Sequence, residues 1–559
     1  MINNSIIKKV GGLIVTLSFL LTACGSATNS PSEAKSATST GGGDSGGSGS
    51  SGGAITFSNI FSQPKQLGVG DVLYADLNNA SSSLDFDGVN PSAEFVLAVI
   101  NASSSQGNLG VTMSGDLAEA DLEIEKSVSG EEDNTIPSVQ SDDVTESFHD
   151  FLRGQERNLE GLEIPSDSSG VSKSVSSASA SVSAGDSQTF KVLSSLSSTT
   201  SYTEVTATAK CVGTNVIFYV DNAVSSSNLS DADIQQLCTN YDPVVAREQN
   251  LYGSLSDVNS DGKVAVLFTP QVNRLGASGG GIITGFFLAN DLYPNNSSNP
   301  ASNYMEMLYI MVPDPSGAYG SAISRSFAMS NLLPSVLPHE LQHAISYNQH
   351  VFVAGGHAED PCLNEGMSHL TEDLMGQGQE NPSRANIYLA SPQSYPVVSC
   401  SSAGLGSRGG TYLFLRYLYE QSGNSDAFLK RLIQTSRTGV ANVEAAYAGP
   451  SDFDQFGEFF LRWSVALTGI TNDARFSFKA RERDSTSGQW RGACVSCSAD
   501  DGRGTTLRGA QASSYRGSQN ATTIPAAARF LKLAQVKDKI QFSNSRAGGE
   551  GYAMLIRSK

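Results

Sequence analysis

The chain has 559 residues, of which 16% are charged, and its 55 acidic side chains against 36 basic ones give a net charge of -19. Binding of nucleic acid requires a surplus of Lys and Arg on at least one face, so this composition argues against a nucleic-acid partner. The acid excess is uneven, since residues 471–559 carry 15 bases and 7 acids. The length and this asymmetry predict more than one module.

The first residues have the pattern of a bacterial lipoprotein signal peptide. Lys8 and Lys9 precede the apolar run Val10–Leu21, and Leu-Thr-Ala-Cys follows with Cys24 at its end. The run is too short to cross a hydrocarbon layer of roughly 30 Å. We therefore expect cleavage after residue 23, lipidation of Cys24, and a protein anchored by lipid in the bacterial cell envelope, facing the surface or the periplasm. Gly25, in place of Asp, favours the outer membrane if the host has two membranes.

Composition and turn residues divide the remainder of the chain into five segments. We expect a Gly- and Ser-rich tether over residues 24–53, a small β domain over 54–140, and a helix with a Ser-rich connector over 141–188. A larger mixed unit is expected over 189–470 and a C-terminal β module over 471–559. In the mixed unit, five β-type runs precede helical material that spans residues 322–350. Strands followed by helices predict an α+β domain with a mixed sheet; the runs are 202–211, 215–221, 264–269, 281–288 and 305–312.

Six cysteines remain once Cys24 is assigned to lipid, and an even number in an exported chain favours disulfides. Proximity in sequence favours pairing Cys211 with Cys238 and Cys362 with Cys400. The remaining pair lies in Cys494-Val-Ser-Cys497, which is also the spacing of redox and metal motifs. No second CxxC accompanies it, so a short structural disulfide is the preferred interpretation.

Histidines point to the chemistry of the chain, because five of the six fall between residues 339 and 369. They include His339-Glu340-Leu341-Gln342-His343, the HExxH pattern. On a helix, positions i and i+4 share a face, so both imidazoles reach one cation while the acid at i+1 turns toward a water molecule. We predict that His339 and His343 bind Zn2+ and that Glu340 is a general base.

A catalytic zinc ion takes three protein ligands and leaves a fourth position open. In one class of HExxH enzymes the third ligand is a His ten residues after the first His of the motif. Here that position is Gln349, and His350 lies one residue too far along the chain. Another class supplies an acid from the next helix, which makes Glu365 the predicted third ligand. Glu359 and Glu372 are the substitutes.

Two more polar residues share a helical face with Glu365. His369 and Glu372 lie within about 60° of it on a helical wheel. We therefore expect them to orient the ligand imidazoles without binding the metal themselves. His350 and His357 are expected to be exposed loop residues.

The chain resembles the hyicolysin-like zinc metallopeptidases from about Phe148 to Trp463. The resemblance rests on Phe148-His-Asp-Phe-Leu-Arg153, Ala207-Thr-Ala-Lys-Cys-Val-Gly213, Asp261-Gly-Lys-Val-Ala-Val-Leu-Phe-Thr269, Met305-Glu-Met-Leu-Tyr-Ile310, the HELQH helix and the Asn-Glu-Gly segment. It implies a zincin-like α+β metallopeptidase domain of the gluzincin type, flanked here by small all-β modules. One departure is Pro338, directly before His339, which predicts that the helix begins near Pro338.

Two further sites are weaker predictions. Tyr412 is a candidate donor to the oxyanion that forms during peptide hydrolysis, although a helix aromatic more often belongs to a core. Asp257, Asn259 and Asp261 have the spacing of the first half of a calcium loop, but Phe268 stands where the bidentate Glu is needed. Bound Ca2+ is therefore one reading, and a plain turn before a strand is the other.

The leading hypothesis is a cell-surface zinc endopeptidase that hydrolyses protein or peptide substrates. The alternative is a non-catalytic surface binding or adhesion lipoprotein on a metallopeptidase scaffold. A third possibility is an enzyme held latent by its N-terminal β unit. The intact set of His339, Glu340, His343 and Glu365 favours the enzyme.

Overall fold

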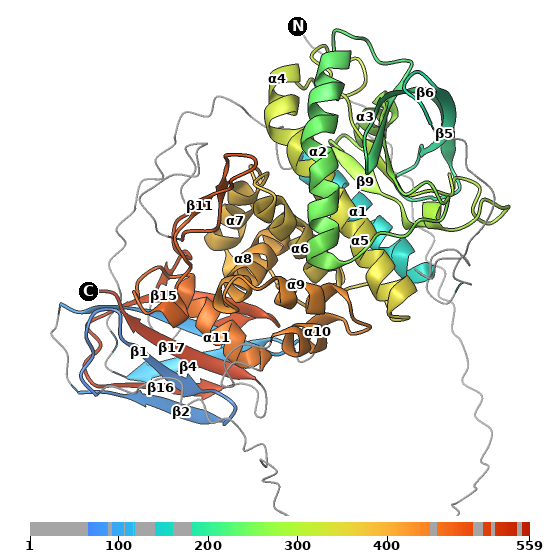
Figure 1. Ribbon diagram of the computed structural model, residues 1–559. Coiled ribbons are helices and arrows are strands. Elements are labelled where there is room, and N and C mark those ends of the chain that lie inside the picture. Colours follow the sequence, from blue (N-terminus) through green and yellow to red (C-terminus); the bar gives the residue numbers. More distant parts are fainter. Residues whose placement is uncertain are drawn as a thin grey trace, which may run out of the picture. The chain divides into compact units, whose positions relative to one another are not determined.

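The fold is taken from a computed structural model (Figure 1). It describes residues 65–87, 92–104, 107–115, 117, 140–159, 162, 182–447, 455–495, 507–515, 520–544 and 550–559. The predicted signal peptide, Cys24 and the tether lie outside these ranges. Within them, every helix is either too short or too polar to cross a bilayer.

A six-stranded mixed sheet forms the first half of the large unit. Its order is β5 (Ser187–Leu193), β6 (Tyr202–Val212), β7 (Val216–Asp221), β8 (Val264–Phe268), β10 (Met307–Ile310) and β9 (Gly285–Phe287). The inner strands β7, β8 and β10 are parallel, and every residue of β8 and β10 is buried. Continuous apolar runs suit strands covered on both faces. The predicted α+β class is confirmed, and β5 adds a strand at the end of the predicted connector.

Three elements link the strands of this sheet: α2 (Asp231–Tyr252), α3 (Pro270–Ser278) and the short η2 (Ala289–Leu292). α2 begins at a capping box in which Ser230 and Asp233 each bind the other's backbone N–H. It packs against β6 and β7 on one side and against the HExxH helix on the other. The sheet and the metal-site helices therefore share one core.

The second half of the unit is helical. Its elements are α4 (Arg325–Phe327), η3 (Ala328–Leu332), α5 (Leu333–Tyr347), η4 (Asn348–Val353), α6 (Pro361–Leu374), α7 (Asn381–Ala390), η5 (Pro392–Ser394), α8 (Leu405–Gln421), α9 (Asp426–Ile433), α10 (Gly439–Ala446), α11 (Phe456–Ala466) and η6 (Ala474–Phe476). The prediction that the HExxH helix begins near Pro338 is wrong. α5 begins at Leu333 with Pro334 in its first turn, and Pro338 lies inside it, after the π-helical η3.

Small residues bring α6, α7 and α8 close together. A Cβ on Gly366 of α6 would lie 2.4 Å from the Thr411 methyl group of α8, and a Cβ on Gly409 would lie 2.1 Å from the Arg384 carbonyl oxygen of α7. Both distances are too short for real atoms, so only glycine permits these approaches. The Gly in Asn-Glu-Gly thus lets α8 reach the segment that carries Glu365.

The helix α1 (Gln140–Asn158) packs into the large unit, although the sequence assigned it to a connector. Glu146 accepts a hydrogen bond from the Leu405 backbone N–H at 2.6 Å, and Asp150 accepts one from Ala403 at 3.0 Å. These carboxylates satisfy free donors at the start of α8, where the helix dipole favours negative charge. α1 is therefore anchored to α8.

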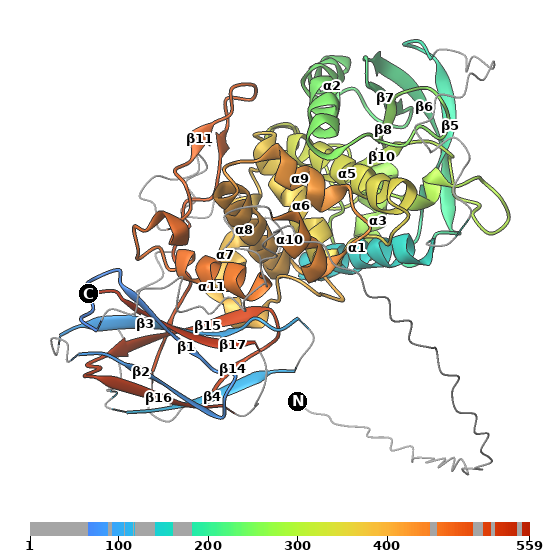
Figure 2. The same ribbon diagram turned by 60° about the horizontal axis from the view of Figure 1, so that its bottom comes forward.

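Strands from residues 72–115 and from residues 513–557 together form a pair of sheets (Figure 2). One sheet has the order β1-β17-β3-β15-β13 and the other β14-β4-β16-β2. The strands are β1 (Val72–Asp76), β2 (Ser81–Asp85), β3 (Glu94–Asn101), β4 (Leu109–Gly115), β13 (Ser513–Ser514), β14 (Asn520–Thr523), β15 (Ala527–Ala534), β16 (Lys539–Asn544) and β17 (Gly551–Arg557); a separate hairpin pairs β11 (Glu482–Arg483) with β12 (Trp490–Arg491). The sequence predicted two separate β modules, but each sheet of this pair takes strands from both segments. Local patterns predict strands and carry no information about such distant partners.

The first of these sheets is buried on both faces. Phe95, Leu97 and Val99 of β3 belong to the core shared with the second sheet, whereas Ala98 and Ile100 belong to the core of the large unit. Because alternate side chains of a strand point to opposite faces, both sets need a covering layer. This explains the unbroken apolar run in β3.

Both preferred disulfide pairs are confirmed, since Cys211 is bonded to Cys238 and Cys362 to Cys400. The first ties β6 to α2, and the second ties the start of α6 to the segment before α8. Cys494 is also disulfide-bonded. Cys497 lies outside the described residues, so the pairing of these two stays a prediction.

The joint sheets predict that the chain ends unfold as one unit. Leu97 of β3 lies opposite Leu555 of β17, and both are fully buried in one core. Leu97→Ala and Leu555→Ala should each lower the free energy of unfolding by about 2–5 kcal/mol, and the double variant should depart from additivity by about 0.5–3 kcal/mol. Urea unfolding measures all three.

The control pair combines Leu97→Ala with Leu429→Ala, because Leu429 is equally buried in the other core. This pair should be additive within about 0.5 kcal/mol. Additive effects of Leu97→Ala and Leu555→Ala would contradict a shared β core.

Candidate metal centre

The HExxH motif lies in the middle of α5, and its chemical side chains are buried. His339 is 5% exposed, Glu340 1% and His343 not at all. The two imidazole rings lie one turn apart with centroids 4.9 Å from each other. The helix therefore presents both rings on one face, as the spacing predicts.

Glu365 on α6 meets both rings. Its Oε2 atom lies 3.4 Å from His339 Nε2, and its Oε1 atom lies 3.7 Å from His343 Nε2. α6 is held in place at its start, where Asp360 accepts hydrogen bonds from the Cys362 and Leu363 backbone N–H groups. The structure thus brings together the three predicted metal ligands.

These three residues fit a divalent metal ion such as zinc. Their ligand atoms all lie within 4.8 Å of one another. Glu365 is fully buried, yet neither of its oxygens accepts a hydrogen bond among the described residues. A buried carboxylate without such bonds is costly unless charge compensates it. Two imidazoles and one carboxylate are a donor set of catalytic zinc sites.

A second group shares His339 and contains His369 and Glu372. The Glu372 Oε1 atom lies 2.7 Å from His339 Nδ1 and 2.9 Å from His369 Nδ1. The first distance is that of a hydrogen bond, which leaves His339 Nε2 directed at Glu365. The structure therefore places His369 and Glu372 next to the ligand set, where the sequence predicted them. A third group, Asp360 with Cys362 and Cys400, is not available to a metal because its sulfurs form a disulfide.

His343 has its own supporting residues. Asn364 Oδ1 lies 2.9 Å from His343 Nδ1, and Ser368 Oγ lies 3.3 Å from the same nitrogen. The Ser368 hydroxyl donates to Gln342 Oε1 at 2.6 Å. The sequence predicted neither Asn364 nor Ser368, although Asn364 directly precedes the predicted ligand. Each imidazole thus has an oxygen partner on Nδ1, which directs Nε2 to the centre.

The charges around Glu365 keep it ionised. Burial raises the pKa of a carboxyl group, but here the Arg408 guanidinium, followed by the imidazoles, holds the pKa of Glu365 well below its usual range. Arg408 Nη1 lies 2.9 Å from Glu365 Oε2. Metal ligands must be deprotonated, so this electrostatic setting suits a cation at the centre.

Glu340 is placed by the edge of the mixed sheet. Its Oε2 atom accepts a hydrogen bond from the backbone N–H of Phe287 in β9 at 2.9 Å. Burial raises the pKa of Glu340, against the opposing charge of His339. A carboxylate of raised pKa is a better proton acceptor, as a general base requires.

Three more residues at the centre, besides Asn364 and Ser368, were not identified from the sequence as site residues. Arg408 comes from α8, whereas His149 and Arg153 come from α1. His149 Nδ1 lies 3.9 Å and Arg153 Nε lies 4.0 Å from Glu365 Oε1. His149 and Arg153 are four positions apart, so they share a helical face. The four-residue spacing was the feature of the sequence that could have indicated these two residues. Two polar side chains at this spacing are common on amphipathic helices, however, so the spacing alone does not indicate a site.

Tyr412 does not join this cluster in any described contact. It is buried in α8, and burial, followed by the charge of Asp373, raises its pKa well above the usual value. The other charges that act on it are those of Arg416, Glu420 and Glu372, the last of which bonds His339. The role of Tyr412 as an oxyanion donor stays a prediction.

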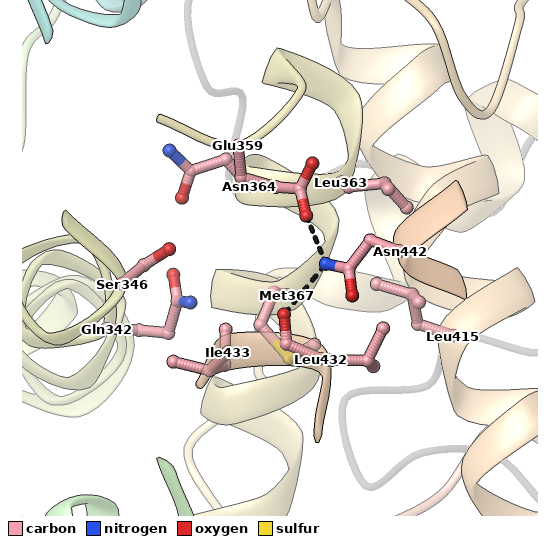
Figure 3. A pocket seen from close by; sticks show the side chains of 10 residues that line it. All are labelled: Gln342, Ser346, Glu359, Leu363, Asn364, Met367, Leu415, Leu432, Ile433 and Asn442. Atoms are coloured by element: carbon pink, nitrogen blue, oxygen red, sulfur yellow. Dashed lines mark hydrogen bonds between the residues drawn. The ribbon is translucent and has the colours of Figure 1, made fainter. Parts of the chain in front are cut away.

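A small cavity lies beside the ligand helices (Figure 3). It is lined by Gln342, Ser346, Glu359, Leu363, Asn364, Met367, Leu415, Leu432, Ile433 and Asn442. The Asn442 side-chain NH2 donates to Glu359 Oε2 and to the Leu432 carbonyl, as the dashed lines in Figure 3 show. The Gly439 backbone N–H donates to Glu359 Oε1 at 2.7 Å. Glu359, one substitute ligand, is therefore engaged by other groups.

The expectation of two exposed loop histidines is wrong for one of them. His350 is fully buried, because the π-helical η4 continues α5 and keeps it in the packed interior. Burial lowers the pKa of His350 to about 4. His357 is exposed, as expected.

The predicted calcium segment forms a turn before β8. Asp257 Oδ1 accepts a hydrogen bond from the Gly262 backbone N–H at 3.0 Å, and Asp261 Oδ1 accepts one from Lys263 at 2.8 Å. The Asn259 side-chain NH2 donates to Asp261 Oδ2 at 2.9 Å. These bonds are those of a polar turn. Calcium binding here stays a prediction.

One comparison with known proteins finds a distant similarity to a metalloprotease. The chain is similar to the neutral metalloprotease ShpI of Staphylococcus hyicus, with 25% identity over 258 residues, which is 45% of this chain and 56% of that protein. The chain thus spans about half the length of the curated relative it matches. No family model matches the chain.

The contact between Glu372 and His339 predicts an effect on metal affinity. Glu372→Gln removes the negative partner of His339 Nδ1 and should weaken zinc binding about 10–100-fold, since outer partners of ligand histidines have effects of that size. Competition with a chromophoric chelator measures the affinity. Glu204→Gln, the same change at an exposed position of β6, should have no effect; equal affinities of both variants would argue against this role.

Metal binding should release a proton from His339. Burial lowers the pKa of an imidazole, but Glu365 and Glu372 outweigh it and raise the pKa of His339 to about 9, whereas burial lowers that of His343 well below its usual value. At pH 7.5 His339 is therefore protonated and His343 neutral, so zinc displaces about one proton. Affinity should rise about tenfold per pH unit until pH 9. Calorimetry in buffers of different ionisation enthalpy counts the proton, and buffer-independent heats would contradict it.

Proposed function

We propose that the chain is a zinc-dependent endopeptidase of the gluzincin type. The observation that carries the proposal is the convergence of His339, His343 and Glu365, with Glu340 beside them on α5. Similarity to a neutral metalloprotease over 45% of the chain agrees with it. The substrate is a protein or peptide, because the chemistry of this donor set and general base is hydrolysis of an amide.

Zinc held by these three residues would polarise the scissile carbonyl group and lower the pKa of a water molecule at the centre. Glu340 takes a proton from that water, whose oxygen adds to the carbonyl carbon. The same carboxyl group then gives the proton to the leaving nitrogen as the C–N bond breaks. Phe287 keeps Glu340 in place through one oxygen, which leaves the other for proton transfer.

The supporting residues serve this reaction by orienting the ligands. Glu372 and Asn364 fix the rings of His339 and His343 through their Nδ1 atoms. Arg408 keeps Glu365 ionised. These contacts come from α6 and α8, so the site is preorganised by packed helices.

We further propose that the protein acts outside the cytoplasm, attached to a bacterial membrane by lipid on Cys24. The support is the sequence pattern that ends at Cys24, together with disulfides at Cys211–Cys238 and Cys362–Cys400. Disulfides are typical of exported proteins. Labelling with a fatty-acid analogue in wild type and Cys24→Ala tests the anchor, and equal labelling would contradict it.

Glu340→Gln tests the enzyme. The amide keeps the shape of the side chain but accepts no proton, so hydrolysis of casein or a quenched peptide should fall about 10²–10⁴-fold while zinc content and thermal stability are retained. A chelator should abolish wild-type hydrolysis, and zinc should restore it.

The exposed Glu204→Gln serves as the control and should keep full activity. Undiminished hydrolysis by Glu340→Gln would contradict the role of this residue. Stoichiometric zinc without hydrolysis of any protein by the wild type would favour the non-catalytic scaffold.

A further inference from the structure

Arg153 on α1 is a buried cation that donates no hydrogen bond to the residues that the structure describes. The residue is 2% exposed, and none of its three guanidinium nitrogens donates a hydrogen bond among the described residues. Its Nη2 atom lies 3.1 Å from Glu156 Oε1, in an ion pair one turn away on the same helix. Buried donors without acceptors are costly, so such a group is expected to meet an acceptor that comes from outside the fold.

The guanidinium lies at the metal centre. Arg153 Nε is 4.0 Å from Glu365 Oε1, the oxygen that also approaches His343. Burial raises the pKa of Glu340 and lowers that of His343; the charge of Arg153 opposes the first shift and adds to the second. Arg153 therefore acts on the general base and on the metal ligands from a helix that carries none of them.

Neutralising Glu365 does not account for Arg153. Arg408 makes the close contact with Glu365, at 2.9 Å, and is the strongest of the charges that lower its pKa. Arg153 at 4.0 Å is beyond hydrogen-bond distance. The centre thus contains one cation paired with the ligand carboxylate and a second cation, paired with Glu156, whose nitrogens donate no hydrogen bond among the described residues.

The position of Arg153 is fixed before any substrate arrives. Glu146 and Asp150, on the same face of α1, bind backbone N–H groups at the start of α8. Phe148 packs edge-on against Phe286 of β9, with centroids 5.3 Å apart. A charge held in a fixed, water-poor site stabilises a developing opposite charge without reorganising.

We propose that Arg153 binds the anionic oxygen that forms on the scissile carbonyl during hydrolysis; this inference rests on the proposed peptidase function. When the water oxygen adds to the carbonyl carbon, the electron pair of the C=O bond moves onto the carbonyl oxygen. The pair returns when the C–N bond breaks and Glu340 protonates the nitrogen. The negative charge exists only between these events, so Arg153 favours the transition state over the bound substrate.

The variants are Arg153→Gln, which removes the charge, and Arg153→Lys, which keeps it without the fork of N–H groups. Arg157→Gln is the matched control, since Arg157 is exposed on the same helix. With peptide substrates, Arg153→Gln should lower kcat about 10²–10³-fold at nearly constant KM, Arg153→Lys should recover part of the loss, and Arg157→Gln should match the wild type.

Ligand binding gives a readout that does not depend on turnover. The zinc-loaded full chain is titrated with a peptide phosphonate, whose tetrahedral anion resembles the intermediate, and with a product peptide. In Arg153→Gln the phosphonate affinity should fall in parallel with kcat/KM, whereas affinities for product and zinc should stay within about threefold of wild type. Arg153→Lys serves as the folded charge-retaining variant if Arg153→Gln unfolds.

Several results would overturn the proposal. A 10–100-fold loss of zinc affinity in Arg153→Gln would make Arg153 a positioning residue for Glu365. A raised KM confined to peptides with a free C-terminal carboxylate, absent for amidated ones, would assign Arg153 to the substrate terminus. Loss of kcat in Tyr412→Phe together with normal kcat in Arg153→Gln would assign the oxyanion to Tyr412.

Failure of the proposed function gives a different result. A wild-type protein that binds zinc but hydrolyses no peptide would contradict the peptidase assignment. Phosphonate affinity would then test the role of Arg153 separately. Weaker phosphonate binding in Arg153→Gln than in Arg157→Gln would support Arg153 as an anion-binding residue, and equal binding would exclude that role.

Discussion

The metal centre depends on the burial of one carboxylate, that of Glu365. A fully buried ionised group without hydrogen bonds is stable only if opposite charge surrounds it. Two helices supply most of that charge: α5 through the protonated His339 and α8 through Arg408. Without Arg408 on α8, the charge of Glu365 would lack its main counter-charge, so the electrostatics of one residue determine how α8 must meet α6.

Close helix packing makes this compensation possible. Gly366 follows Glu365 directly and lets α8 approach α6, which brings Arg408 within 2.9 Å of the ligand carboxylate. The acids Glu146 and Asp150 bind free N–H groups at the start of α8 and so hold α1 against it. The same two contacts therefore serve helix capping and the orientation of charge.

Local and periodic features of the site were predictable from the sequence. The spacing of His339 and His343, the Asn-Glu-Gly segment around Glu365 and two of the disulfide pairs follow from patterns within about 40 residues. Contacts set by tertiary packing were not predictable. His350 was expected in a loop because the motif spacing did not reveal the π-helical continuation of α5, and no local pattern pairs β3 with β15 and β17.

The contribution of α1 changes where the functional unit begins. A boundary at residue 189, as composition indicates, would separate His149 and Arg153 from the ligands they approach within 4.0 Å. Without α1, the N–H groups at the start of α8 would also lose their carboxylate partners, and Arg408 would be less firmly held next to Glu365. Because α8 carries the cation that keeps the metal ligand ionised, the helix before the Ser-rich connector is part of the metal centre in both charge and packing.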